Sequence, residues 1–216
     1  MKNNIITSQP ITLSQIPLLI DFDHVYLRNA MEKTGVPDQQ LPPLLTMNEL
    51  EVGLNKNDYL QWLFVNNTLA GYVWIEKKMD CIYIAGVALK PEFHGQGLIQ
   101  MILHVTEQIA NENNLSICRL AAIPLNGRAI NAYLKWGYKI TACVEAFFGD
   151  QYPDSFRFIL EKNLLDNKMQ EYSEQCEIYC YENEKLKHAT DNGYVGISLI
   201  ASEKFDNAKN KILFKK

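Results

Sequence analysis

The chain has 216 residues, of which 47% are hydrophobic and 21% are charged. This length suits one ordinary domain with or without an appendage, and the apolar content is sufficient for a large core. The net charge of −4 argues against a general nucleic-acid-binding protein, because no basic excess is present to neutralise phosphates. Residues 1–23 hold only a short, interrupted apolar stretch, so we expect neither a signal peptide nor a membrane span.

The five cysteines are scattered and odd in number, which argues against a disulfide framework. They are Cys81, Cys118, Cys143, Cys176 and Cys180. Three of them lie in apolar runs, where cysteine is usually a small buried hydrophobic residue. No second Cys or His pair accompanies the last two, so we expect no zinc or other metal. The pattern is typical of a protein of a reducing compartment, and we expect it to be cytoplasmic.

The N-terminal part is expected to be helical before the first long strands. Apolar residues at helical spacing predict a helix over residues 12–31, and a proline-rich loop follows over 36–45. Thr46 and Glu49 have capping-box spacing, which predicts a short helix to about Asn55.

Strands and helices then alternate in a way that indicates a sheet flanked by helices. Strands are predicted over 59–65, 69–76, 81–89, 116–123, 139–148 and 155–160, and helices over 98–111 and 126–136. The first three strands are separated by short turns and should form an antiparallel meander. We therefore expect an α/β (α+β) fold with a mixed, mostly antiparallel central sheet. No internal repeat is evident in the sequence.

The segment Val87–Gln100 joins a strand to a helix through a turn that contains Gly95 and Gly97. Such a turn exposes backbone N–H groups at the positive end of a helix, which favours an anion. Glycine lets the backbone approach a pyrophosphate closely, since no Cβ intrudes. Taken alone, the pattern also fits a plain strand-to-helix turn.

Two sequence blocks in the right order resemble the GCN5-related N-acetyltransferase (GNAT) superfamily. The segment Val87–Gln100 is similar to its acetyl-CoA motif, and Asn126–Tyr138 is similar to its Asn-x-x-Ala-x-x-x-Tyr-x-x-x-Gly-Phe helix. The resemblance covers roughly residues 1–165. It implies the acyl-CoA N-acyltransferase fold, with acetyl-CoA as co-substrate and no metal.

The resemblance implies a role for each matching residue. Cofactor-binding positions are Val87, Ala88, Leu89, His94, Gly95, Gln96, Gly97, Leu98, Ile99, Gln100, Asn126, Ala129 and Tyr133. The first three would pair with the pantetheine arm, and backbone N–H groups from Gly95 onward would hold the pyrophosphate. Tyr133 would place its hydroxyl near the sulfur and assist the leaving thiolate. Its alternative role is a packed helix aromatic.

The chain departs from the family pattern at three places. His94 stands where the family has Arg or Gln, and Ile99 adds bulk where the family keeps Gly or Ala. The strand before the motif also lacks the glutamate that serves as general base in many family members. Gly86 in that strand suits a β-bulge instead. Three acidic residues at strand ends or hairpins are expected to be solvated rather than catalytic: Asp80, Glu145 and Asp150.

The absence of an evident base favours an α-amine as acceptor. At pH 7 a lysine amine of pKa ~10.4 is unprotonated in only about one molecule in 2,500, whereas an α-amine of pKa near ~8 is unprotonated in about one in ten. The leading interpretation is acetyl transfer by direct attack of a primary amine, either a small molecule or a peptide N-terminus. Two alternatives are a non-catalytic CoA-binding or assembly domain and a binding module for longer acyl-CoAs.

Residues 166–216 lie beyond the resemblance and read as a small C-terminal extension. Strands are predicted over Cys176–Tyr181 and Tyr194–Ile200, and an amphipathic helix over Ser202–Leu213 with Phe205, Ala208 and Ile212 on one side. The extension is too small to form its own core. We expect it to pack on the main domain or on a second subunit, which leaves a homodimer open.

Overall fold

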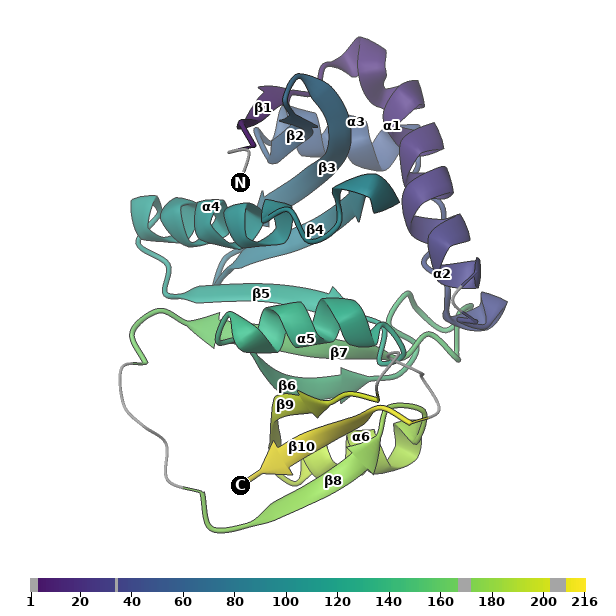
Figure 1. The fold of residues 1–216 in the computed structure, drawn as a ribbon, viewed down its shortest axis with the longest axis vertical. Coiled ribbons are helices and arrows are strands. Elements are labelled where there is room, and N and C mark those ends of the chain that lie inside the picture. The colour runs from purple at the N-terminus through teal and green to yellow at the C-terminus, as the bar shows by residue number, and fades with distance from the viewer. Residues whose placement is uncertain (1–3, 34, 167–171, 203–208) are drawn as a thin grey trace. The chain divides into compact units, whose positions relative to one another are not determined.

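The computed structural model describes residues 4–33, 35–166, 172–202 and 209–216 (Figure 1). Residue contacts divide the chain into two compact units. The first unit comprises Met1–Val36 and Leu41–Leu115, and the second comprises Pro37–Gln40 and Ser116–Lys216. The predicted division into residues 1–165 and 166–216 rests on the family resemblance and stays a prediction.

The first unit contains a four-stranded antiparallel sheet in the order β1-β2-β3-β4. Its strands are β1 Ile6–Pro10, β2 Tyr59–Val65, β3 Thr68–Lys77 and β4 Ile82–Leu89. Its α-helices are α1 Ile16–Asp23, α2 Asn29–Lys33, α3 Met47–Asn55 and α4 Leu98–Glu112. A π-helical segment, η2 His24–Arg28, connects α1 to α2, and short 3-10 turns cover Leu13–Gln15 and Pro91–Phe93.

Most elements of the first unit match their predictions. The meander is confirmed, with strand bounds within one residue of those expected. The capping box is confirmed too, because the Glu49 N–H donates to Thr46 Oγ1 at 3.3 Å and the Thr46 N–H donates to Glu49 Oε2 at 2.9 Å. Strand β1 was not predicted. It pairs with β2 from Ile6 opposite Val65 to Pro10 opposite Gln61, with four of its five residues exposed.

The core of this unit lies between α1 and the sheet. Ile16, Leu19 and Phe22 recur at helical spacing on α1 and are buried. The Phe22 ring packs edge-on against Trp62 of β2 at 5.5 Å and against Tyr72 of β3 at 6.2 Å between ring centres. These aromatic contacts fix α1 on the sheet and place its last residue, Asp23, in the interior.

The second unit contains six strands in the order β5-β7-β6-β9-β10-β8. The strands are β5 Ile117–Ala122, β6 Lys139–Val144, β7 Arg157–Asn163, β8 Gln175–Tyr179, β9 Val195–Ile200 and β10 Lys211–Lys215. Its helices are α5 Gly127–Lys135 and α6 Asn183–Asp191, and each pairing of these neighbours is antiparallel. The predicted β6–β7 hairpin is confirmed, although its second strand also pairs with β5.

Of the elements predicted for the C-terminal extension, the two strands are confirmed and the helix is partly wrong. The two strands are confirmed as β8 and β9. The helix predicted over Ser202–Leu213 is wrong at its end, because Lys211–Lys215 forms strand β10. Ile212 and Phe214 are buried and alternate with partly exposed residues, which is the period of a strand. Phe205 and Ala208 lie outside the described residues. Helix α6 was not predicted.

Candidate acetyltransferase site

The segment Val87–Gln100 forms a strand, a tight turn and a helix start. The Lys90 N–H donates to Ala70 O at 2.8 Å and holds the end of β4 against β3. Gly95 and Gly97 have φ values of +75° and +87°, a left-handed conformation that favours glycine, and α4 begins at Leu98. No side chain caps the N-terminus of α4.

The backbone N–H groups from Gly95 to Gln100 have no hydrogen-bond acceptor among the described residues. The first N–H that is paired is that of Met101, which donates to Gly97 O at 3.0 Å. These unpaired donors stand at the positive end of a helix of 15 residues. The turn therefore has the donors and the electrostatic potential that an anion such as a pyrophosphate requires.

The side chains of the turn bind mostly to the turn itself. A ring nitrogen of His94, Nε2, lies 3.2 Å from Leu89 O. The Gln96 amide donates to Glu92 O at 2.8 Å and accepts from the Asn4 amide at 2.7 Å. Leu98 is buried, Ile99 is half-buried and Gln100 is exposed. The row of donors is therefore a backbone feature, and Ile99 is the β-branched side chain in the first helical turn.

The predicted β-bulge in β4 is confirmed. Trp74 of β3 pairs with Gly86, whereas the next residue, Ile75, pairs with Ile84, so Ala85 is the extra residue. A Cβ on Gly86 would lie 3.0 Å from the Tyr72 hydroxyl oxygen. Beyond the bulge Val87 is half-buried, while Ala88 and Leu89 are buried.

A buried, hydrogen-bonded pair of a tyrosine and an aspartate lies beneath this bulge and was not predicted from the sequence. The Tyr72 hydroxyl donates to Asp23 Oδ1, and the two residues are only 1% and 4% exposed. Burial raises the pKa of Asp23, and the Tyr72 hydrogen bond partly opposes this rise. Burial also raises the pKa of Tyr72 well above its usual value. The sequence signal was an aspartate directly after Phe22 in an otherwise apolar helical pattern.

Asn126, Ala129 and Tyr133 belong to the second unit and lie on α5 or at its start. Asn126 caps the helix, since its Oδ1 accepts from the Ala129 N–H at 3.3 Å. Tyr133 is half-buried, and its hydroxyl makes no hydrogen bond to a described residue. Burial raises the pKa of Tyr133 to about 12, so the phenol stays protonated at neutral pH. It is therefore available as a hydrogen-bond donor.

The other titratable groups are less suited to chemistry. Asp80, Glu145 and Asp150 are exposed, as expected. Burial raises the pKa of both Cys143 and Cys180 to about 12, which disfavours the thiolate that a cysteine nucleophile needs. These two thiols are therefore poor nucleophiles at neutral pH.

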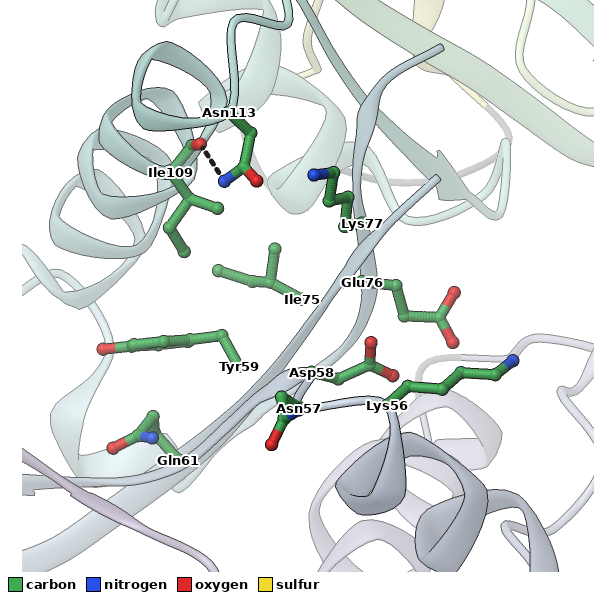
Figure 2. Close-up of a pocket in the computed structure, with 10 residues that line it drawn as sticks. All are labelled: Lys56, Asn57, Asp58, Tyr59, Gln61, Ile75, Glu76, Lys77, Ile109 and Asn113. Atoms are coloured by element: carbon green, nitrogen blue, oxygen red, sulfur yellow. Dashed lines mark hydrogen bonds between the residues drawn. The ribbon is translucent and has the colours of Figure 1, made fainter. Parts of the chain in front are cut away.

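A hollow of about 610 Å³ lies at the other end of α4 (Figure 2). Its lining includes Ile109 and Asn113 of α4 and residues 56–59 before and at the start of β2. The Asn113 amide closes the helix end by donating to Ile109 O at 2.8 Å. No residue of the predicted cofactor set lines this hollow, and helix α4 separates it from the unpaired N–H groups by about 20 Å.

Solved structures with a similar fold include acetyltransferases in complex with coenzyme A or acetyl-CoA. A family model described as the acetyltransferase (GNAT) family matches residues 26–138, more than half of the chain. The chain therefore belongs to the acetyltransferase (GNAT) family and is an N-acetyltransferase of that family. The predicted fold class, a mixed and mostly antiparallel sheet with helices, is confirmed with it.

One relative is similar in sequence, and solved acetyltransferase structures share the fold. A Bacillus subtilis protein named putative [ribosomal protein bS18]-alanine N-acetyltransferase is 27% identical over 139 residues, which are 63% of this chain and 87% of the relative. The Escherichia coli ribosomal-protein-S18-alanine N-acetyltransferase superposes with a TM-score of 0.57 and 12% identity, over 78% of this chain and 100% of that chain. The PaiA N-acetyltransferase of Thermoplasma acidophilum, in complex with coenzyme A, superposes with a TM-score of 0.59 and 16% identity, over 74% and 99%.

No helix in the described parts of the chain combines the length and the apolar character that a membrane span requires.

Proposed function

We propose that this protein transfers the acetyl group of acetyl-CoA to the α-amine of a peptide or protein N-terminus by direct attack in a ternary complex. The observation that carries the proposal is the row of unpaired backbone N–H groups from Gly95 to Gln100 at the start of α4. A backbone donor row at a helix N-terminus fits a pyrophosphate. Gly95 and Gly97 add no Cβ atoms to this row, and each has a positive φ and open space around it.

Within this proposal, the remaining cofactor contacts follow from the geometry of each unit. Asn126 uses its carbonyl oxygen to cap α5, and its side-chain N–H groups, which have no partner among the described residues, can donate to the pantetheine arm. Val87, Ala88 and Leu89 offer main-chain groups beside the bulge at Ala85. Acetyl-CoA supplies an activated thioester, and the protein positions it for the amine.

Tyr133 is proposed to stabilise the departing thiolate through a hydrogen bond. A phenol with a pKa of about 12 is a weaker acid than a thiol with a pKa near ~8.5, so full proton transfer to the sulfur would be uphill. A hydrogen bond to the developing negative charge has no such requirement. The side chain therefore acts as a fixed donor rather than as a proton source.

Two observations support an α-amine as the acceptor. The three acidic side chains named as candidate bases, Asp80, Glu145 and Asp150, are exposed, so none of these three is held in a buried environment that would raise its pKa and make it a strong base for a lysine. An α-amine needs less help, because about one molecule in ten is already unprotonated at pH 7. The name of the Bacillus subtilis relative likewise gives an alanine of ribosomal protein bS18 as its acceptor.

A matrix of acyl-CoAs and peptides, read by thiol release, tests the proposal. Each peptide is offered in two forms: one with a free N-terminus and no lysine, and one with an acetylated N-terminus and an internal lysine. We expect acetyl-CoA and the free N-terminus to give the fastest release. Faster release from the lysine form would refute the acceptor class. Tight acetyl-CoA binding with no release from any amine would favour the non-catalytic alternative instead.

The half-buried Ile99 gives a prediction about cofactor affinity. Its β-branched side chain stands in the first turn of α4, among the unpaired donors. We expect Ile99→Ala to tighten acetyl-CoA binding several-fold, because the smaller residue lets the pyrophosphate approach the backbone more closely. Titration calorimetry measures the dissociation constant, with Ile109→Ala at the far end of the same helix as the control. An unchanged constant would contradict the prediction.

A further inference from the structure

The second unit contains the same arrangement of elements twice. The order strand, helix, strand, strand occurs as β5-α5-β6-β7 and again as β8-α6-β9-β10. Helices α5 and α6 have nine residues each, and strands β6 and β9 have six each. The two helices begin 56 positions apart, at Gly127 and Asn183. The two strands also begin 56 positions apart, at Lys139 and Val195.

The strand registers repeat as well. In the first copy Leu160 pairs with Leu120 on one side and Ile140 on the other. In the second copy Phe214 pairs with Cys176 and Gly196, which are the residues 56 positions after Leu120 and Ile140.

A β-bulge recurs at the same place in both copies. It leaves Thr141 as the extra residue between Ile140 and Ala142, and Ile197 as the extra residue between Gly196 and Ser198. Because a bulge shifts the register at one residue, its recurrence at matching positions shows that the ladders correspond residue by residue.

The helix ends are alike in backbone geometry. The residue that precedes α5, Asn126, has a φ of −84° and a ψ of 64°. The residue that precedes α6, Glu182, has nearly the same values, a φ of −87° and a ψ of 62°. At the other end Gly137 and Gly193 have φ values of +91° and +82°. Each glycine is followed by a tyrosine whose backbone N–H donates to a carbonyl oxygen of the preceding helix. The Tyr138 N–H donates to Tyr133 O and the Tyr194 N–H donates to Ala189 O, both at 3.1 Å.

The two copies meet around a local twofold axis. Ile140 of β6 pairs antiparallel with Gly196 of β9, and these two residues occupy equivalent positions in their copies. The flanking contacts are reciprocal, since α5 packs against β9 and α6 packs against β6. Equivalent residues pair in this way in an isologous contact between two identical subunits.

We propose that residues 175–202 and 209–215 form a second, non-catalytic copy of the half-domain 117–163, which occupies the β6 edge as an internal partner in place of a second subunit. An unpaired β6 edge would present free N–H and C=O groups to other chains. The second copy covers it through Gly196 and through Thr190, whose Oγ1 accepts from the Cys143 N–H at 3.1 Å.

The second copy also lacks the side chains proposed for catalysis. Ala189 stands at the position of Tyr133, and Glu182 stands at the position of Asn126. Its non-catalytic character therefore rests on the roles proposed for Tyr133 and Asn126, whereas the pairing at β6 does not depend on them.

The contact at the axis is tight enough to test with one side chain. A Cβ on Gly196 would lie 2.9 Å from Cβ and Cδ1 of Ile140 and 2.9 Å from Ile212 Cγ2. In the full-length chain we expect Gly196→Val to release β9 from β6. Exposed Ser198 on the same strand gives the control Ser198→Val, which adds the same side chain without this clash.

Hydrogen exchange and sedimentation provide the readouts. We expect amide exchange in residues 139–144 to rise at least about tenfold in Gly196→Val and to stay unchanged in Ser198→Val. The wild-type chain and the control should sediment as monomers of 24.8 kDa, while Gly196→Val should form concentration-dependent dimers or larger species. A folded Gly196→Val with unchanged exchange, or a wild-type dimer, would overturn the proposal.

An exchange of side chains covers the case in which Gly196→Val does not fold. Gly196→Ile alone should be strongly destabilised, whereas adding Ile140→Gly should recover part of the free energy of unfolding, because the equivalent positions face each other. A double variant no more stable than the sum of the single effects predicts would contradict the local twofold contact.

Discussion

Replacing Tyr133 by phenylalanine is expected to lower kcat by about 10- to 100-fold with little change in acetyl-CoA affinity. The estimate follows from the loss of one hydrogen bond to a charged group, about 1.5–3 kcal/mol, at 1.36 kcal/mol per factor of ten in rate. The hydroxyl makes no other hydrogen bond to a described residue, so its removal should leave α5 intact. Initial rates of thiol release at saturating substrate provide the measurement.

The pH dependence separates a hydrogen-bond donor from a general acid. With a pKa of about 12, the Tyr133 phenol remains protonated from pH 6 to 10, so its own titration should not appear in the wild-type profile. The wild type and Tyr133→Phe should then have parallel profiles of log kcat against pH over this range. Tyr181→Phe, which alters an exposed tyrosine of the second unit, serves as the control. Profiles that diverge above neutral pH would show that the phenol titrates and would contradict the assignment.

The sequence was most informative where function depends on backbone conformation. Gly95 and Gly97 mark the donor row because few other residues adopt their positive φ values, and Gly86 marks the bulge because Tyr72 leaves little space for a Cβ. The capping box at Thr46 is equally local, since both hydrogen bonds lie within four residues. Local constraints of this kind leave a residue-level signature that can be read without the fold.

Features that depend on distant contacts could not be read in this way. Strand β1 is mostly exposed and is defined by its pairing with β2, about 55 residues away. The repeat in the second unit preserves backbone geometry but little sequence. Helix α6 is largely polar, and the first copy has Tyr133 where it has Ala189. Short elements that tertiary pairing determines give weak periodicity, which is why the final strand β10 was read as the end of a helix.

Replacing Tyr72 by phenylalanine should destabilise the protein by about 1–3 kcal/mol at neutral pH, because it leaves the buried Asp23 carboxylate without its hydroxyl donor. Replacing its hydrogen-bond partner, Asp23→Asn, should instead stabilise the protein at neutral pH. An asparagine oxygen still accepts from Tyr72, but it carries no charge to desolvate. Denaturant unfolding at several pH values measures both effects.

The sign of the pH dependence follows from the raised pKa of Asp23. Below its unfolded pKa of about 3.9, the group is protonated in both states, and burial has no ionic cost. As pH rises through the higher folded pKa, the ionised carboxyl destabilises the folded state, so the wild type loses stability relative to Asp23→Asn. The difference in free energy of unfolding between Asp23→Asn and the wild type should therefore appear above about pH 4 and be largest at neutral pH.

Exposed Asp21, two residues away on α1, provides the matched control. Asp21→Asn should follow the wild-type curve, since its carboxylate is already in water. Asp23→Asn curves that also run parallel to the wild type would show that the pKa of Asp23 is the same in the folded and unfolded states, and would contradict the prediction. A stability difference that is still growing at neutral pH would show that Asp23 remains protonated in the folded state, where it and Tyr72 form a neutral hydrogen-bonded pair beneath the β4 bulge.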